Sequence, residues 1–237
     1  MMMLSVCMAT YNGEQFVLRQ LDTVLKQLGP NDEVIVIDDC SKDNTVKVIN
    51  ETYGSRVQVI VNEGNLGAIK SFEKAISLAK GDILFLCDQD DLWEDNKVST
   101  VVKAFKEQEA VLVVHDAYVV NGSLESISPS WNQYNQNNIN QGVLGNILKN
   151  AFTGAMMAFK RELVADILPF PSSIEMHDQW IALVCMLKKK KIVFIDQPLM
   201  KYVRHGGNVT GMKKRSLFIQ LRGRLRTIFA IAIYKRT

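Results

Sequence analysis

The chain has 237 residues, of which 47% are hydrophobic and 22% are charged, close to average globular usage. This composition excludes a disordered chain, a collagen-like repeat and a small disulfide-stapled protein. The net charge of +3 is uneven, because residues 212–237 hold eight Lys and Arg and no acid, which leaves 20 basic and 25 acidic residues before them. We expect one globular domain followed by a basic C-terminal segment.

The sequence predicts a cytoplasmic protein. No apolar run approaches the ~18 residues that would cross a bilayer, and the start, Met-Met-Met-Leu-Ser-Val, lacks the basic region of a signal peptide. Cys7, Cys40, Cys87 and Cys185 are widely spaced and form no Cys-x-x-Cys pair. This spacing favours reduced thiols over disulfides or a zinc site.

The first half alternates short apolar runs with helical patterns. Strands are expected at Ser5–Ala9, Glu33–Ile37, Arg56–Val61 and Asp82–Cys87, and helices at Glu14–Leu28, from about Asn44, and at Gly67–Lys80. Apolar strands separated by helices indicate a parallel sheet covered on both faces. Ligands bind such sheets at the carboxyl ends of the strands, so functional residues should follow the strands.

The second half is less regular. Helices are expected at Glu94–Gln108 and His177–Leu187, and strands at Ala110–His115, Thr153–Phe159, Ile192–Ile195 and Leu199–Val203. The stretch 121–141 contains six Asn and three Gln. Its polarity predicts a long loop or lid.

Polar side chains follow three of the predicted strands. They are Thr10, Tyr11 and Asn12 after the first, Asp38 and Asp39 after the second, and Asp88, Asp90 and Asp91 after the fourth. The glycine-rich loops that bind dinucleotides or ATP phosphates are missing. Carboxylates repel phosphate unless a cation lies between them, and Mg²⁺ takes one or two carboxylates plus phosphate oxygens. Asp88 and Asp90 can supply such a site; the alternatives are a helix cap at Asp90 or Asp91 and a simple turn at Asp38 and Asp39.

These motifs together resemble those of a known family. The segments Ser-Val-Cys-Met-Ala-Thr-Tyr-Asn12, Val-Ile-Val-Ile-Asp-Asp-Cys-Ser41, Asn65-Leu-Gly67, Cys87-Asp-Gln-Asp-Asp-Leu-Trp93 and His177-Asp-Gln-Trp180 resemble the successive motifs of family 2 glycosyltransferases, over roughly residues 4–210. The resemblance implies the GT-A fold, a Rossmann-like α/β fold with a mostly parallel central sheet, helices on both faces and a small mixed acceptor-side region. With Tyr202-Val-Arg-His205, the wording is most similar to a bacterial rhamnosyltransferase-type subgroup that builds surface polysaccharides.

The resemblance implies an inverting transfer from a nucleoside-diphosphate sugar to an acceptor hydroxyl, with Mg²⁺ or Mn²⁺. The donor would be dTDP-rhamnose or, next, a UDP-hexose. Residues 1–115 would form the donor half and residues 116–210 the acceptor half. Asp178 would be the catalytic base. The nucleotide would be held by Thr10, Tyr11, Asn12, Asp38, Asp39, Asn65 and Asp88, and the metal by Asp90, Asp88 and His205.

Four residues are candidates for the acceptor side, namely Asp116, Trp131, His177 and Trp180. Alternatives stay open: Asp178 as a helix cap, His177 and His205 as ordinary surface or loop residues, and the tryptophans as core residues. Ala9 and Cys40 depart from the residues usual in the family, so backbone contacts there are expected to differ.

Residues 211–237 predict a basic amphipathic helix. It would lie on an anionic membrane at the inner face of the plasma membrane, pack on its own domain, or form a homodimer; a lipid-linked saccharide acceptor would favour the membrane. The run Lys188–Lys191 fits a solvated helix end, and no nucleic acid partner is expected. Two competing functions are a non-catalytic nucleotide-sugar-binding protein and a sugar-nucleotide pyrophosphorylase, although the glycine-rich loop of the latter is missing.

Overall fold

The computed structural model describes residues 2–205 and 216–234. Its strands are β1 (Leu4–Thr10), β2 (Glu33–Asp38), β3 (Gln58–Val61), β4 (Ile83–Asp88), β5 (Leu92–Trp93), β6 (Leu112–Asn121), β7 (Ser126–Ser128), β8 (Met157–Lys160) and β9 (Ile192–Arg204). They form one sheet in the order β3-β2-β1-β4-β8-β6-β9-β5, with β7 paired to β6.

Strands β1 to β4 form the parallel part of the sheet. Residues of β1, β2 and β4 are buried along nearly their whole length, as their continuous apolar sequences predict for strands covered on both faces. The register pairs Thr10 with Asp38 and Ala9 with Asp88. The carboxyl ends of three strands therefore meet at one edge.

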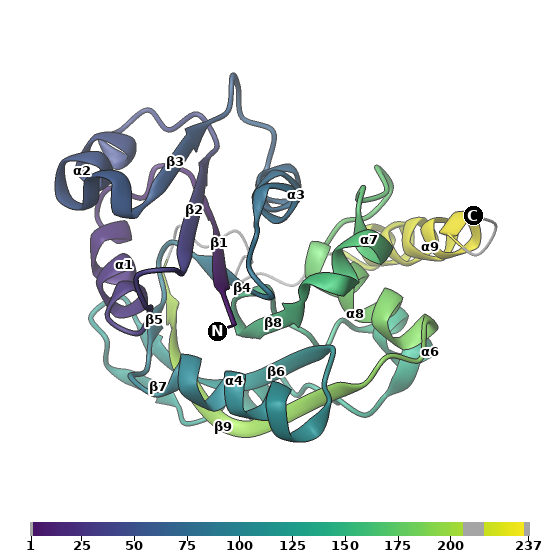
Figure 1. Cartoon of the computed structure of the whole chain (residues 1–237). Coiled ribbons are helices and arrows are strands. Elements are labelled where there is room, and N and C mark those ends of the chain that lie inside the picture. Colours follow the sequence, from purple (N-terminus) through teal and green to yellow (C-terminus); the bar gives the residue numbers. More distant parts are fainter. Residues whose placement is uncertain (1, 206–215, 235–237) are drawn as a thin grey trace.

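The helices cover this sheet on both sides. They are α1 (Val17–Leu25), α2 (Thr45–Tyr53), α3 (Ala68–Leu78), α4 (Lys97–Gln108), α5 (Trp131–Tyr134), α6 (Gly142–Leu148), α7 (Val164–Ile167), α8 (His177–Leu187) and α9 (Leu217–Tyr234), with 3-10 turns η1 (Gly54–Arg56), η2 (Gly154–Met156) and η3 (Arg161–Leu163). Figure 1 shows α1 and α2 on one side of β1–β3 and α3 on the other. The predicted α/β class is confirmed.

The second half of the sheet is mixed and curls across the first. Strand β8 pairs antiparallel with both β4 and β6, whereas β6 and β9 run parallel to each other (Figure 1). Strand β9 is one continuous strand, where the sequence predicted two. Its register with β6 shifts near Asp116, which is paired with Pro198. An irregularity at this point accommodates a proline within a strand.

The polar stretch 121–141 is more ordered than the expected loop. It contains β7 and α5, and Ser130 caps α5 by accepting a hydrogen bond from the Gln133 N–H. Helix α6 follows at once and was not predicted, because Gly142, Gly145 and Asn146 lower its helix propensity. No helix in the described ranges is long and apolar enough to cross a membrane.

Candidate functional site

The carboxyl end of β2 is held by a network around Asp38. The Thr10 hydroxyl donates to Asp38 Oδ1 at 2.9 Å, and the Ser41 hydroxyl and N–H donate to Asp38 at 2.6 and 2.8 Å. The Asp38 side chain is fully buried. Asp38 therefore fixes the turn after β2, next to the end of β1.

Asp39 connects β2 to the start of α3. Its carboxylate accepts hydrogen bonds from the backbone N–H groups of Leu66 and Gly67 at 2.8 and 2.7 Å, and from the Asn62 amide at 3.0 Å. Burial raises the pKa of Asp39, but these hydrogen bonds outweigh it and hold the pKa below its usual value. The exposed Asn65 immediately precedes this clamp.

The loop after β1 is fastened to the loop after β4 by Gln89. The Gln89 side chain accepts from the Tyr11 N–H at 2.9 Å and donates to the Tyr11 carbonyl at 3.1 Å. A Cβ atom on Gly13 would lie 2.2 Å from Gln89 Oε1, so a larger residue here would displace the Gln89 amide from this position. Asn12 donates its N–H to the Ser41 hydroxyl, whereas Tyr11 is 44% exposed. Gln89 is not among the site residues that the sequence predicts, although its position between Asp88 and Asp90 could have indicated a role there.

The three aspartates at the end of β4 and just after it, Asp88, Asp90 and Asp91, make different contacts. Asp91 is buried, and its Oδ1 accepts from the Val203 N–H of β9 at 3.1 Å. Burial, then the charges of Asp90 and Asp88, raise the pKa of Asp91 well above its usual range. Helix α4 begins at Lys97 with no side-chain cap hydrogen bond. The alternative that Asp90 or Asp91 caps this helix is therefore wrong.

Asp90 and Asp88 face two different partners. Asp90 Oδ2 lies 2.8 Å from His205 Nε2, and the His205 ring stacks on Phe16 at 4.6 Å between centroids. Burial, followed by the charges of Asp90 and Asp178, raises the pKa of Asp88 to about 7. The Asp178 charge thus acts on Asp88, which shows that these two carboxyl groups lie near each other.

Asp178 is held in the second half of the chain by three donors. Its Oδ1 accepts from the Asn150 amide at 3.0 Å and from the Gln179 N–H at 2.6 Å, and its Oδ2 accepts from the Gly154 N–H at 3.2 Å. The residue at the N-cap position of α8 is Met176, and Asp178 lies inside the first turn. Asp178 is therefore not the N-cap residue. Asn150 and Gly154 had no signal in the sequence, because each is distant from Asp178 along the chain.

His177 packs next to this base candidate. Its ring stacks on Phe72 of α3 at 4.4 Å, and a Cβ on Gly154 would come within 2.7 Å of its Nε2. Burial lowers the pKa of His177, against the opposing charge of Asp178. A neutral His177 at the start of α8 therefore packs against both α3 and η2.

The other acceptor-side candidates lie inside the fold. Trp131 is buried, donates to the Thr153 hydroxyl and packs on Tyr202, and Trp180 is buried against Tyr234. The buried Asp116 accepts from the Ser130 hydroxyl and from two backbone N–H groups, those of Ala117 and Asn132. Burial favours a packing role for both rings, and the hydrogen bonds of Asp116 favour a role in fixing α5.

Lys97 is the first residue of α4, six positions after the aspartate loop (residues 88–91), and is fully buried. Its ammonium donates to the Ala155 carbonyl at 2.8 Å and lies 4.1 Å from the centre of the Trp93 ring. Burial lowers the pKa of Lys97 to about 7, opposed by Cys87, Asp91 and Asp88. This lysine, which the sequence did not single out, connects α4 to η2.

The carboxylates fit a divalent cation completed by phosphate oxygens. The charges of Asp90 and Asp178 raise the pKa of Asp88, and a cation would relieve this repulsion. Residues 2–205 and 216–234 contain no group of three or more His, Cys, Asp and Glu side chains arranged to hold a metal ion by themselves. Mg²⁺ needs fewer protein ligands when substrate phosphates supply the remainder.

Comparisons with known proteins point to one family. The sequence model of Glycosyl transferase family 2 matches residues 5–168. An uncharacterized glycosyltransferase of Nostoc sp., alr2836, is 24% identical over 215 residues, which cover 87% of this chain and 66% of that protein. The Escherichia coli protein WfgD, named UDP-Glc:alpha-D-GlcNAc-diphosphoundecaprenol beta-1,3-glucosyltransferase, is 28% identical over 172 residues, which cover 71% of this chain and 64% of that protein.

Solved structures show the same fold. The crystal structure of S. aureus TarS 1-349 in complex with UDP-GlcNAc has a TM-score of 0.67 at 20% identity, covering 91% of this chain and 62% of that one. The mannosyltransferase PcManGT from Pyrobaculum calidifontis, in complex with GDP-Man and Mn²⁺, has a TM-score of 0.63 at 22% identity, covering 99% of this chain and 64% of that one. The chain thus spans about two thirds of the length of these four proteins.

The fold and the family model agree on the part of the chain that carries the aspartates. The match over residues 5–168 takes in more than half of the chain and includes the ends of β1, β2 and β4, where Thr10, Asp38 and Asp88 lie. The mixed α/β sheet has the GT-A-like architecture of the solved relatives. The chain belongs to glycosyl transferase family 2.

Proposed function

We propose that the chain is an inverting glycosyltransferase that moves a sugar from a nucleoside-diphosphate sugar to an acceptor hydroxyl in bacterial surface polysaccharide synthesis. One observation carries this proposal: Asn150 and Gly154 hold the Asp178 carboxylate in the second half of the chain, close enough to the end of β4 for its charge to raise the pKa of Asp88. Inversion requires deprotonation of the acceptor on one face of the sugar while the diphosphate leaves from the other. Carboxylates from two halves of the fold suit these two tasks.

Asp178 is assigned as the general base in this proposal. Its three hydrogen bonds are all donated to it by the protein, so they fix the direction of the carboxylate and leave it able to accept a proton. The acceptor hydroxyl would approach from the side of residues 116–210 and give its proton to Asp178. The donor would be held by residues 1–115.

Asp90, Asp88 and His205 are assigned to hold a divalent metal, Mg²⁺ or Mn²⁺. When bound, the metal would offset negative charge on the leaving diphosphate. Support comes from the 2.8 Å contact between Asp90 and His205 and from the repulsion between Asp88 and Asp90. The solved structure of PcManGT is a complex with GDP-Man and Mn²⁺.

The nucleoside is proposed to lie between the exposed Tyr11 ring and the clamp formed by Asp39 with Leu66 and Gly67. Thr10, Asn12, Asp38 and Asn65 would shape this pocket through the turns that they form or flank. We propose a pyrimidine nucleotide donor. A UDP-hexose is supported by WfgD and by a second E. coli relative, WfaP, both named for UDP-Glc, and dTDP-rhamnose by the motif wording around Asp90 and His205.

The acceptor is proposed to be a saccharide linked to a membrane lipid. WfgD and WfaP are named for an acceptor on diphosphoundecaprenol, and TuaG of Bacillus subtilis for teichuronic acid biosynthesis. An acceptor of this kind is anchored in a bilayer. The proposal therefore places the enzyme in the cytoplasm, at the inner face of the plasma membrane.

A donor screen tests the proposal. Purified protein would be incubated with UDP-, dTDP- and GDP-sugars, each with Mg²⁺, Mn²⁺ or EDTA, and release of the nucleoside diphosphate would be measured. We expect metal-dependent release of UDP or dTDP, which Asp178→Asn slows. Nucleotide binding without turnover, with or without lipid-linked acceptors, would indicate a non-catalytic binding protein, and formation of a sugar nucleotide from a nucleoside triphosphate would indicate a pyrophosphorylase.

A further inference from the structure

Helix α9 presents a broad apolar face to solvent. Phe218 is 75% exposed, Phe229 60% and Leu225 58%. At about 100° per residue, Phe218, Leu221 and Phe229 all lie within about 40° of Leu225 around the helix axis. Ile219, Ile228 and Ile233 widen the exposed face. Exposed apolar patches of this kind mark interaction surfaces.

Helix α6 extends the same surface. Its Leu144 is 78% exposed, and Leu148 is also exposed. The Arg224 side chain of α9 donates to the Leu148 carbonyl at 3.0 Å, which fastens the end of α6 to α9. The exposed leucines of α6 thus lie next to α9, and we name the exposed apolar residues of the two helices together the α6–α9 face.

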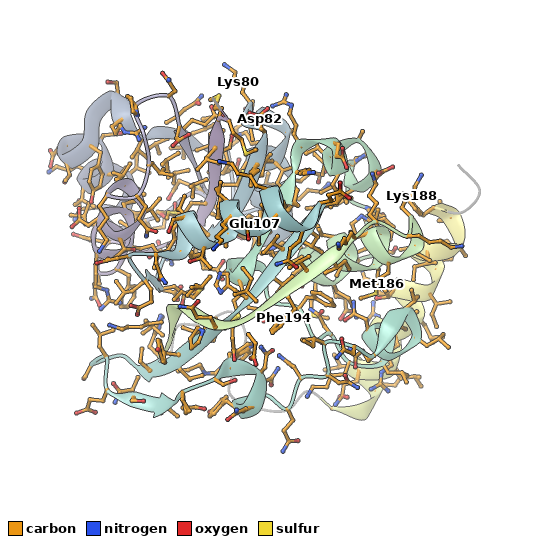
Figure 2. All side chains as sticks on the ribbon, turned by 60° about the horizontal axis from the view of Figure 1, so that its bottom comes forward. Lys80, Asp82, Glu107, Met186, Lys188 and Phe194 are labelled. Atoms are coloured by element: carbon orange, nitrogen blue, oxygen red, sulfur yellow. The ribbon has the colours of Figure 1, made fainter. Side chains whose placement is uncertain are left out.

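The opposite side of α9 is docked on the protein. Thr227, Ala230 and Ile231 are buried, and the Thr227 hydroxyl donates to the Gln179 side chain at 3.3 Å. Figure 2 shows Lys188 at the end of α8 beside α9, and its ammonium lies 5.6 Å from the centre of the Tyr234 ring. The body thus holds α9 in place, with its apolar side turned outward.

Arginines border the apolar face on both sides. Arg224 and Arg226 each lie about 100° from Leu225, in opposite directions around the helix. Arg226 donates to the Ser172 carbonyl and pairs with Glu175, so the two arginines flank the face at fixed positions. Arg222 is exposed within the face, and residues 212–237 contain eight basic residues and no acid.

From this arrangement we infer that the α6–α9 face binds the surface of an anionic lipid bilayer, with α9 lying in the plane of the membrane. An apolar face flanked by basic residues matches acyl chains bordered by anionic headgroups. A second copy of the chain fits less well, because a two-fold contact would bring the same basic segments together. The inference rests on this face alone and is independent of the donor, metal and base proposed above.

Vesicle co-sedimentation of the full chain tests the inference. We expect binding to vesicles of phosphatidylglycerol and phosphatidylcholine, weaker binding to phosphatidylcholine alone, and loss of binding in high salt. The double variant Leu225→Glu/Phe229→Glu should bind at least about tenfold more weakly, because it places two charges in the apolar face. Ile127→Glu, at an exposed apolar position on β7, is the matched control and should bind like wild type.

Circular dichroism and donor turnover in solution would show that the double variant is folded, since neither position belongs to the proposed active site. Equal binding of wild type and double variant to anionic vesicles would overturn the inference. A second result would also overturn it. If wild type does not bind vesicles but forms a dimer in light scattering, and the double variant is monomeric, then the face is a homodimer interface.

Discussion

Asp90 and His205 meet at 2.8 Å although 115 positions separate them in the chain. Asp90 follows β4 in the first half of the chain, whereas His205 directly follows β9 in the second half. Asp91 reinforces the junction by accepting the Val203 N–H. The aspartate loop is therefore held between strands from both halves of the chain. We expect substitutions in this loop to lower activity more than they lower stability.

Asp90→Ala should abolish sugar transfer while the melting temperature stays close to that of wild type. The carboxylate is proposed to bind the metal and contributes little to the core. Metal titration should show weakened Mn²⁺ binding, and EDTA should inactivate the wild type. Asp95→Ala is the control, because Asp95 is an exposed aspartate that forms a surface ion pair with Lys26. Full activity of Asp90→Ala would rule out this metal site.

Asp178→Asn should lower turnover by at least ~100-fold, because general-base assistance is typically worth about 10² to 10⁴ in rate. Asparagine keeps the size of the side chain, so nucleotide and metal affinity should be retained. Single-turnover transfer and isothermal titration would separate the two effects. If turnover stayed near normal, the base would lie elsewhere, and Asp116 would be tested next despite its buried hydrogen bonds.

Tyr11→Ala should weaken nucleotide binding roughly tenfold, because stacking of a base on an aromatic ring is worth about 1–3 kcal/mol. Tyr11→Phe keeps the ring and should bind nearly as wild type. Calorimetry with UDP, dTDP and GDP would compare the three bases. Tighter binding of GDP than of both pyrimidine nucleotides would contradict the proposed donor class.

Lys97 should make stability rise with pH. Burial lowers its pKa to about 7, whereas a lysine in the unfolded chain has a pKa of about 10.4. Between these values the unfolded state binds one proton more than the folded state, so the free energy of unfolding from this group rises by about 1.4 kcal/mol per pH unit. Below pH 7 the group is charged in both states and contributes no slope.

Lys97→Met removes this titration. From about pH 7 to about pH 9, urea unfolding should show wild-type stability increasing relative to the variant by roughly 2 kcal/mol. Lys103→Met is the control, because Lys103 is on the same helix but exposed. Parallel stability curves for wild type and Lys97→Met would show that the buried amine does not titrate in this range.

Much of the fold follows from local pattern. Helix α8 has the predicted bounds, His177–Leu187, because a long apolar run is bounded by a change to charged residues at Lys188. The sequence predicts two strands in place of β9, because Asp196, Gln197 and Pro198 interrupt its apolar pattern. Its continuity depends on pairing with β6, which is a long-range interaction that no local pattern contains.

The candidate site likewise contains residues that local sequence patterns predict and residues that only tertiary contacts bring together. The strand-end aspartates could be found in the sequence, since parallel strands place their carboxyl ends together. Their partners could not, because Gln89 reaches Tyr11 from another strand and Asn150 reaches Asp178 across 28 positions. Trp131 lies in a polar stretch but is covered by Tyr202 of β9, so its burial also depends on tertiary contacts.

In the clamp after β2, both carboxylate oxygens of Asp39 accept hydrogen bonds from the backbone of Leu66 and Gly67. These hydrogen bonds fix the start of α3, and the amides of Leu66 and Gly67 should therefore exchange slowly with deuterium. A nucleotide bound beside this clamp, as proposed above, would order little new backbone, so less of its interaction energy would be lost to conformational entropy. Discrimination between donors would then arise from the fit of the base and sugar to a fixed shape.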